Sequence, residues 1–216
     1  MKALKVDATS EELLDAGSTL WRKAETVAIH MFPAPLGMVE ERSPFLALNK
    51  DHGAIETMKG SAIHNTKALA VRISWEVSTV KDRLDDLDDF VDAVGVMFPL
   101  DEDALAMTMG SKDALTNVWY WKANHTEPYD VLSKGFGSTE RRPGSSSKLA
   151  VVAKRRGNIW DVIFTRPFQV DGGAEFAGFA PGETTGIAFA AWAGANNERS
   201  GMKSISGEFS ELVIGV

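Results

Sequence analysis

The feature of this sequence that most constrains its fold is a series of short apolar or alternating runs. Most of these runs are bounded by Gly, Pro, Asn or Asp, and helical periodicity is never sustained for long between them. We expect strands at residues 26–32, 55–64, 68–77, 90–98, 115–122, 148–154, 159–164, 184–192 and 204–214. Short strands separated by turns fit two packed antiparallel sheets better than alternating strands and helices. The sequence therefore predicts an all-β fold, an antiparallel β-sandwich with short helices and long loops.

The length of the chain, 216 residues, is typical of a single-domain sandwich, and we expect one domain over residues 1–216. Residues 1–25 are a candidate peripheral N-terminal extension. Within them, Ser10 precedes two glutamates and paired leucines, which predicts a short helix capped by this serine. Residues 124–147 contain two prolines and several Gly and Ser, which predicts a long excursion over the surface.

Composition excludes several classes of function. The absence of cysteine rules out disulfides, thiolate zinc sites, iron–sulfur clusters and covalent haem attachment through C-x-x-C-H. The net charge of −7 argues against a nucleic-acid partner and suits a basic protein partner, such as a small electron carrier. No apolar run reaches about 18 residues, so we expect no membrane span. The first residues lack the apolar core of a signal peptide, so we expect a cytoplasmic protein or a chain that begins after a removed leader.

One lysine and one methionine stand out as candidate metal ligands. Lys203 follows a glycine-bracketed turn and precedes the last predicted strand, where its side chain can be withdrawn from water. Desolvation disfavours the ammonium form, so a buried lysine loses its proton readily and can bind a metal as a neutral amine. Met109 precedes Gly110, and a thioether is a soft ligand that suits a haem iron. Together they suggest the two axial ligands of a haem held without a covalent bond.

Other interpretations of these residues stay open. Most methionines fill the core and most lysines are solvated. Met107 lies two positions before Met109, on the same face of an extended segment, and competes with it as a ligand. The histidines show no spacing typical of a metal site, but His64 or His125 is the alternative axial ligand if Lys203 is not one.

An acidic run covers residues 82–89 and contains five aspartates. Clustered carboxylates can bind calcium, although this spacing does not match an EF-hand loop. The leucines between the aspartates favour a solvated connector that leads into the next strand. The same run can contribute to docking of a positively charged partner.

Two tryptophans offer a function of another class. Trp119 and Trp121 point to one face of a predicted strand, and paired indoles on a sheet can stack on sugars or fill the core. A carbohydrate-binding β-sandwich module is therefore the alternative function. The sequence contains no G-x-S-x-G elbow, H-E-x-x-H helix or phosphate-binding G-x-x-x-x-G-K-[ST] loop, so catalysis by this chain alone is not expected.

Several blocks together resemble the haem b-binding γ subunits of the ethylbenzene dehydrogenase type. Relatives of this type occur in dimethyl sulfide dehydrogenase and in chlorate and selenate reductases, which are molybdenum enzymes of the dimethyl sulfoxide reductase family. The resemblance spans the chain from about residue 68 to its end. In order, the blocks are AVRISW (70–75), DFVDAVGVMFP (89–99), MG (109–110) with NVWYW (117–121), WDVIFTRPF (160–168) and the segment 190–206 around Lys203.

The resemblance implies a β-sandwich that carries one non-covalent haem b, iron protoporphyrin IX, between a methionine and a lysine. Carried onto this chain, the axial ligands are Met109 and Lys203. It further implies a non-catalytic, cytochrome b-like electron-transport subunit in the periplasm. Such a subunit relays electrons between the iron–sulfur β subunit of a complex with a molybdenum-containing α subunit and a soluble cytochrome c.

Overall fold

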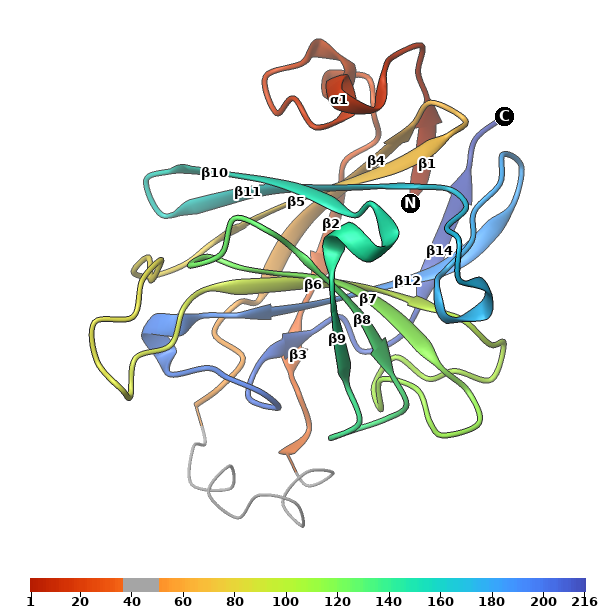
Figure 1. The fold of residues 1–216 in the computed structure, drawn as a ribbon. Coiled ribbons are helices and arrows are strands. Elements are labelled where there is room, and N and C mark those ends of the chain that lie inside the picture. The colour runs from red at the N-terminus through yellow and green to blue at the C-terminus, as the bar shows by residue number, and fades with distance from the viewer. Residues whose placement is uncertain (37–50) are drawn as a thin grey trace.

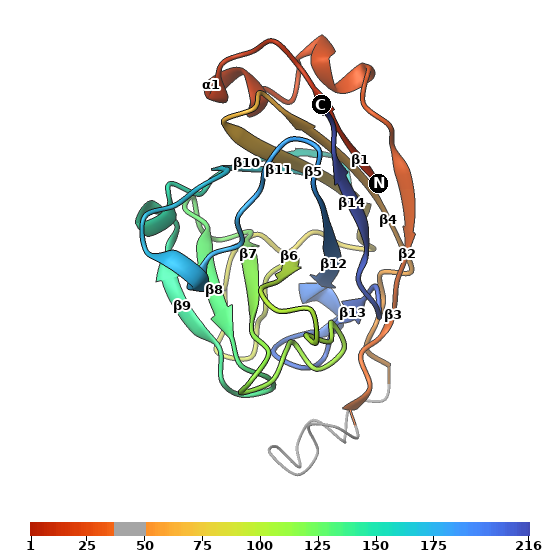
Figure 2. The ribbon, with the colours of Figure 1, turned by 90° about the vertical axis from the view of Figure 1, so that its right-hand side faces the viewer.

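The computed structural model, which describes residues 1–36 and 51–216, shows two facing β-layers (Figures 1 and 2). The first layer contains, in spatial order, β10 (Ala150–Arg156), β11 (Ile159–Pro167), β5 (Ala68–Glu76), β4 (Thr57–His64), β1 (Lys2–Lys5) and β14 (Ser210–Ile214). The second contains β12 (Thr184–Trp192), β6 (Ala93–Pro99), β7 (Thr116–Lys122), β8 (Tyr129–Ser133) and β9 (Glu140–Pro143). The predicted all-β sandwich is confirmed.

Strand β12 joins the two layers. Its first residues, 184–187, pair with β14, whereas residues 188–192 pair with β6. Three short strands extend the layers: β2 (Val27–His30) beside β4, β13 (Ser204–Ile205) beside β12, and β3 (Phe32–Pro33) beside β13. Because β12 pairs with a strand of each layer, it holds the edge of the second layer next to the edge strand of the first.

The N-terminal residues enter the sheet directly. β1 lies between β4 and β14, and its pairing with both is parallel, unlike the antiparallel pairing of the other strands in the described residues. Ala3 is fully buried, and its carbonyl accepts a hydrogen bond from the N–H of Gly215 at 3.0 Å. Figure 2 shows the two termini on the same side of the molecule. Of the segment 1–25, residues 2–5 are thus part of the first layer.

Helices are short. The one α-helix in the described residues, α1 (Ser10–Leu13), is where the sequence predicts it, but its cap is Thr9 and not Ser10. Thr9 and Glu12 form a reciprocal capping box, because each side chain binds the backbone N–H of the other. The described residues also form short 3-10 helices: η1 (Thr19–Arg22), η4 (Gly144–Ser147), η5 (Gly173–Glu175) and η6 (Gly194–Asn196).

Several stretches differ from the strand predictions: β1 was not expected as a strand, and the strand expected at 26–32 is divided into β2 and β3. The expected surface excursion at 124–147 contains β8 and β9, which complete the second layer. The expected single strand at 204–214 is divided into β13 and β14, because Gly207 adopts a φ of 82° between them.

The space between the layers is filled with aromatic side chains. The Trp119 ring of β7 lies 4.8 Å, centroid to centroid, from Phe98 of β6 and 6.4 Å from Phe164 of β11 in the facing layer. Trp119 and Trp121 are both buried in this core. Because side chains alternate along a strand, Val118, Tyr120 and Lys122 of the same strand point to the opposite face.

Candidate functional site

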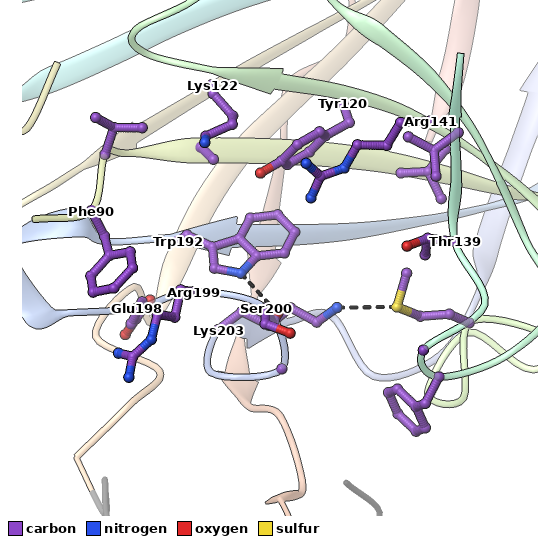
Figure 3. A pocket seen from close by; sticks show the side chains of 18 of the residues that line it. Phe90, Tyr120, Lys122, Thr139, Arg141, Trp192, Glu198, Arg199, Ser200 and Lys203 are labelled. Carbon is purple, nitrogen blue, oxygen red and sulfur yellow. Dashed lines mark hydrogen bonds between the residues drawn. The ribbon is translucent and has the colours of Figure 1, made fainter. Parts of the chain in front are cut away.

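A pocket of about 640 Å³ lies on that opposite face of the second layer (Figure 3). Its floor includes Val118, Tyr120 and Lys122 of β7, Val131 of β8 and Trp192 at the end of β12. Loops that follow or precede these strands form its walls. Pockets of about 300–1,000 Å³ with apolar linings and a few polar groups are typical of small-molecule and cofactor sites.

Lys203 and Met109 meet at one wall of this pocket. The Nζ atom of Lys203 donates to the Sδ atom of Met109 at 3.2 Å, and both residues line the pocket (Figure 3). Lys203 is 4% exposed, and its Nζ atom lies 5.1 Å from the centre of the Trp192 ring. The structure therefore brings together the two residues that the sequence singles out.

The backbone of Met109 is held tightly. Met109 has a φ of 59°, which is uncommon for a residue other than glycine, and Gly110 continues the turn with a φ of 80°. The Met109 carbonyl accepts three hydrogen bonds, from the N–H of Gly135 and the hydroxyls of Thr116 and Ser133, at 2.8–3.1 Å. An unusual φ persists where surrounding contacts enforce it. These bonds fix the position from which the thioether enters the pocket.

The backbone around Lys203 is also anchored by hydrogen bonds. Its carbonyl accepts a hydrogen bond from the N–H of Ala34 at 2.9 Å. The next residue, Ser204, pairs with β12 and β3, and its hydroxyl accepts the N–H of Ile55 at 3.1 Å. Met202, on the other flank, is fully buried. The lysine thus projects from an anchored segment.

The buried carboxylate of Glu198 anchors the loop that leads to Lys203. Glu198 is 1% exposed, and its two oxygens accept hydrogen bonds from the N–H groups of Gly53, Ala54 and Ala193 and from the side-chain amide of Asn196, at 2.7–3.0 Å. Four donors satisfy the charge without a cation. Glu198 therefore ties the loop after β12 to residues 53–54.

Burial makes Lys203 easier to deprotonate than an ordinary lysine. Burial lowers the pKa of Lys203 to about 8, and no carboxylate in the described residues forms an ion pair with it. The sulfur of Met109 is only a weak hydrogen-bond acceptor and compensates little for the lost hydration. Near neutral pH the amine can therefore give up its proton for a modest free-energy cost and act as an electron-pair donor.

The other candidate ligands do not line the 640 Å³ pocket, although Met107 lines a smaller neighbouring cavity with Met109 and Lys203. Met107 is 42% exposed, and its sulfur is not the one that Lys203 contacts. His64 is buried in β4 at the side of Phe168, and burial lowers its pKa. His125 is exposed and follows β7, where it contacts Tyr129. Neither histidine lines the pocket.

The alternative interpretation of Trp119 and Trp121 as a sugar platform is excluded by their burial. Trp119 is 0% exposed and Trp121 is 3% exposed, because both indoles fill the space between the layers. A buried ring cannot stack on a sugar. The interpretation as core residues is the correct one.

The acidic run borders the pocket mouth. Leu84, Leu87 and Asp89 line the pocket, and the Leu87 side chain is fully exposed. Asp89 pairs with Lys81 at 3.1 Å and Asp85 pairs with Arg83 at 3.0 Å. Within residues 1–36 and 51–216, no group of three or more His, Cys, Asp or Glu side chains is arranged to hold a metal ion. In the same residues, no helix is both long enough and apolar enough to cross a membrane.

Sequence reasoning missed most of the pocket lining. Tyr120 and Lys122 alternate with the two core tryptophans, and that alternation is the signal that could have found them. Trp192, Arg141 and Arg199 carry no comparable signal, because they reach the pocket from strand ends and loops. Burial raises the pKa of Tyr120 to about 12, so its hydroxyl stays protonated in the pocket.

The donor set fits a haem iron. A thioether and a neutral amine are both recognised axial ligand types for iron, and they stand here on one wall of a largely apolar pocket. Lys203 and Met109 are therefore the residues that would hold such an iron.

Comparison with known proteins gives a consistent family. The ethylbenzene dehydrogenase family model matches residues 18–154. Chlorate reductase subunit gamma of Ideonella dechloratans is 30% identical over 199 residues, which are 90% of this chain and 77% of that protein. A candidate respiratory nitrate reductase heme subunit, ORF7 of Haloferax mediterranei, is 31% identical over 192 residues, 88% of this chain and 64% of that protein.

A solved structure shares the fold. A family 9 carbohydrate-binding module from Caldicellulosiruptor kristjanssonii, in complex with glucose, superposes with a TM-score of 0.57 over 100% of this chain and 96% of that chain. Sequence identity is 10%, so the similarity concerns the fold alone.

Proposed function

This chain belongs to the ethylbenzene dehydrogenase family, and on that premise we propose that it is the haem-carrying electron-transfer subunit of a molybdenum oxidoreductase complex. In this proposal one haem b is held without a covalent bond, with Met109 and Lys203 as its axial ligands. The chain itself transforms no substrate. It is a γ-type subunit of the kind named in chlorate reductase and, as a heme subunit, in the nitrate reductase relative.

The single observation that carries the proposal is the contact between Lys203 and Met109. A lysine that is 4% exposed, without a carboxylate partner in the described residues, points its amine at a thioether sulfur 3.2 Å away. No structural need of the sandwich explains this arrangement, because an apolar side chain would fill the position without the cost of burying an amine. A ligand role for the amine explains that cost.

The residues of the site have distinct tasks in this mechanism. Lys203 supplies a neutral nitrogen and Met109 a soft sulfur, which favours the reduced state of iron. With protein groups on both axial positions, the haem would supply one-electron exchange and not oxygen or substrate chemistry. Phe136, Val118 and Trp192 give the pocket apolar lining, and the hydrogen bonds to the Met109 carbonyl and to Glu198 hold both ligand segments in place.

Membership of the family supports a proposal about the partners. We propose that the chain assembles with an iron–sulfur β subunit and a molybdenum-containing α subunit in the periplasm and passes electrons between the β subunit and a soluble cytochrome c. The parent complex is of the chlorate or selenate reductase type or of the dimethyl sulfide or ethylbenzene dehydrogenase type. The exposed acidic run at the pocket mouth, with Leu84 and Leu87, supports docking of a basic carrier there. Copurification of the chain with such subunits tests this assembly.

The haem site itself is tested by absorption spectroscopy. Purified protein supplied with one equivalent of haem should show the spectrum of a low-spin, six-coordinate haem in both oxidation states. Lys203→Ala should convert it to a high-spin or weakly held form. A protein that gains no such spectrum, or a Lys203→Ala variant with an unchanged one, contradicts the proposal. A carbohydrate-binding function predicts no haem spectrum at all.

A further inference from the structure

Three cations of the pocket have no carboxylate partner in the described residues. Lys122, Arg141 and Arg199 all line the pocket, and none of them forms an ion pair with an acid in residues 1–36 or 51–216. Instead, the Arg141 guanidinium lies 5.4 Å from the centre of the Tyr120 ring, and the Arg199 guanidinium lies 4.4 Å from the centre of the Phe90 ring. Aromatic faces hold these guanidinium groups in place but do not neutralise them.

The acids of the pocket are already engaged. Asp89 pairs with Lys81 at 3.1 Å and also accepts the N–H of Asp85. Glu198 accepts four hydrogen bonds, three of them from backbone N–H groups, as described above. Among the residues that line the pocket, these are the acids. Neither of them forms a salt bridge with the three cations, so the pocket carries uncompensated positive charge.

This charge is unusual for the protein as a whole. The chain has a net charge of −7, so a positive pocket is not a consequence of its composition. Lys122 is half-buried, and burial together with the neighbouring charge of Arg141 lowers its pKa. Two like charges that face the same space without an anion raise the free energy of the folded state. A ligand with negative charge in that space would remove the repulsion.

Figure 3 shows Lys122 and Arg141 on either side of Tyr120, and Arg199 beside Phe90, with Trp192 between the two groups. We propose that Lys122, Arg141 and Arg199 bind the two propionate carboxylates of the haem and so set which edge of the macrocycle faces the pocket mouth. This inference rests on the proposed function, since it assigns the rest of the same site. Guanidinium and ammonium groups form charge-assisted hydrogen bonds with carboxylates, and a tetrapyrrole with two such groups matches the charge of the pocket.

The propionates can be neutralised without changing the iron. Haem and haem dimethyl ester are titrated into the wild-type protein in the same mixed aqueous–organic buffer, and binding is followed by absorbance. We expect haem to bind at least about tenfold more tightly than its ester, because only the ester lacks the anionic groups. The low-spin spectrum of the bound forms should be the same, since both ligands present the same iron to Lys203 and Met109.

Variants then assign the difference to these residues. Lys122→Gln, Arg141→Gln and Arg199→Gln should each weaken haem binding about three- to tenfold and leave ester binding unchanged, and the triple variant should lose the preference for haem. Arg156→Gln is the matched control, because Arg156 is 82% exposed on β10 and does not line the pocket. It should keep the wild-type preference.

The outcomes separate the two proposals. If neither haem nor its ester gives a low-spin spectrum with wild-type protein, the proposed function fails. If both bind equally well with that spectrum, the haem site stands and the assignment of the three cations is wrong. If wild type prefers haem but the triple variant keeps that preference, other groups bind the propionates. The wild-type comparison needs no substitution, so a misfolded variant does not affect it.

Discussion

The Nζ atom of Lys203 lies 3.2 Å from the Sδ atom of Met109, although 94 positions of sequence separate the two residues. Each comes from a short segment beside the second layer, and each segment is fixed by backbone hydrogen bonds that do not involve the other. The contact is therefore a product of two independently anchored loops. Changes to either loop should alter the site in a predictable way.

Substitution of the two nearby methionines should have different effects. Met109→Leu removes the sulfur next to Lys203 and should lower haem affinity by at least about tenfold, with loss of the low-spin spectrum. Met107→Leu is the matched control, because the Met107 side chain is 42% exposed and the Lys203 amine donates to the Met109 sulfur instead. Titration of both variants with haem measures the difference. A larger loss for Met107→Leu would transfer the ligand role to that residue.

The stability of the protein without haem should rise with pH because of Lys203. Its pKa is about 8 in the folded state, against an ordinary value of 10.5. Between these values the unfolded chain binds more protons than the folded one, so the free energy of unfolding increases with pH, by on the order of 3 kcal/mol in total. Below pH 8 both states are protonated and the full cost of burial remains. In Lys203→Met this rise should disappear from urea unfolding curves recorded at pH 7–11, while an unaltered slope would mean that the amine is solvated.

Haem affinity should also depend on pH. The amine must lose its proton before it can bind iron, so affinity should rise about tenfold per pH unit up to about pH 8 and level off above it. Spectroscopic titrations between pH 6 and 9 measure this profile. In Lys203→Ala the tenfold dependence should be lost. A wild-type profile that is flat across this range would exclude lysine ligation.

Glu198→Gln should loosen the loop that carries Lys203. An amide has one acceptor oxygen, so at least one of the N–H groups of Gly53, Ala54 and Ala193 loses its partner in a buried place. We expect a loss of about 2 kcal/mol in the free energy of unfolding, and faster hydrogen exchange at these three amides than elsewhere. Glu208→Gln, at an exposed position, should change neither quantity. Equal protection in both variants would show that Glu198 does not secure the loop.

Gly110→Ala tests the turn that presents Met109. An added Cβ atom would lie 2.5 Å from the carbonyl oxygen of Ala114, in addition to the strain of a φ of 80°. Gly173→Ala is the matched control, because Gly173 has a φ of 73° but no atom within 4 Å of the added Cβ. The control should lose about 1 kcal/mol from backbone strain alone. Gly110→Ala should lose clearly more in urea unfolding and should also bind haem more weakly, and equal losses would contradict the close packing described here.

The strands of the sandwich were predictable where their side chains alternate. β5, β7 and β12 were expected within one residue at either end, because runs of apolar residues ended at Gly, Asn or charged positions. β8 was missed, since Asp130 is fully buried within it. Its carboxylate accepts hydrogen bonds from Asn117, Arg142 and Ser147, all of which lie far from it in the sequence. A buried polar network of this kind depends on tertiary contacts that a sequence pattern does not contain.

The site was predictable only in part, for a similar reason. Lys203 and Met109 could be selected because lysine and methionine beside glycine have a definite chemistry when buried. Arg141 and Arg199 could not, because most arginines are solvated and only the fold shows that these two face the same pocket without an acid. The role of Glu198 could not be predicted either, because its partners are mainly backbone N–H groups, which leave no signal in the sequence.

Strand β7 places Trp119 and Trp121 in the interior and Val118, Tyr120 and Lys122 in the pocket. Selection can thus alter Val118, Tyr120 or Lys122, and with them the polarity felt by a bound cofactor, without disturbing the scaffold that Trp119 and Trp121 maintain. Residues that stabilise the core and residues that line the pocket therefore alternate along this seven-residue strand. A mutational scan of this one segment should consequently split into a stability phenotype and a redox-potential phenotype, alternating residue by residue.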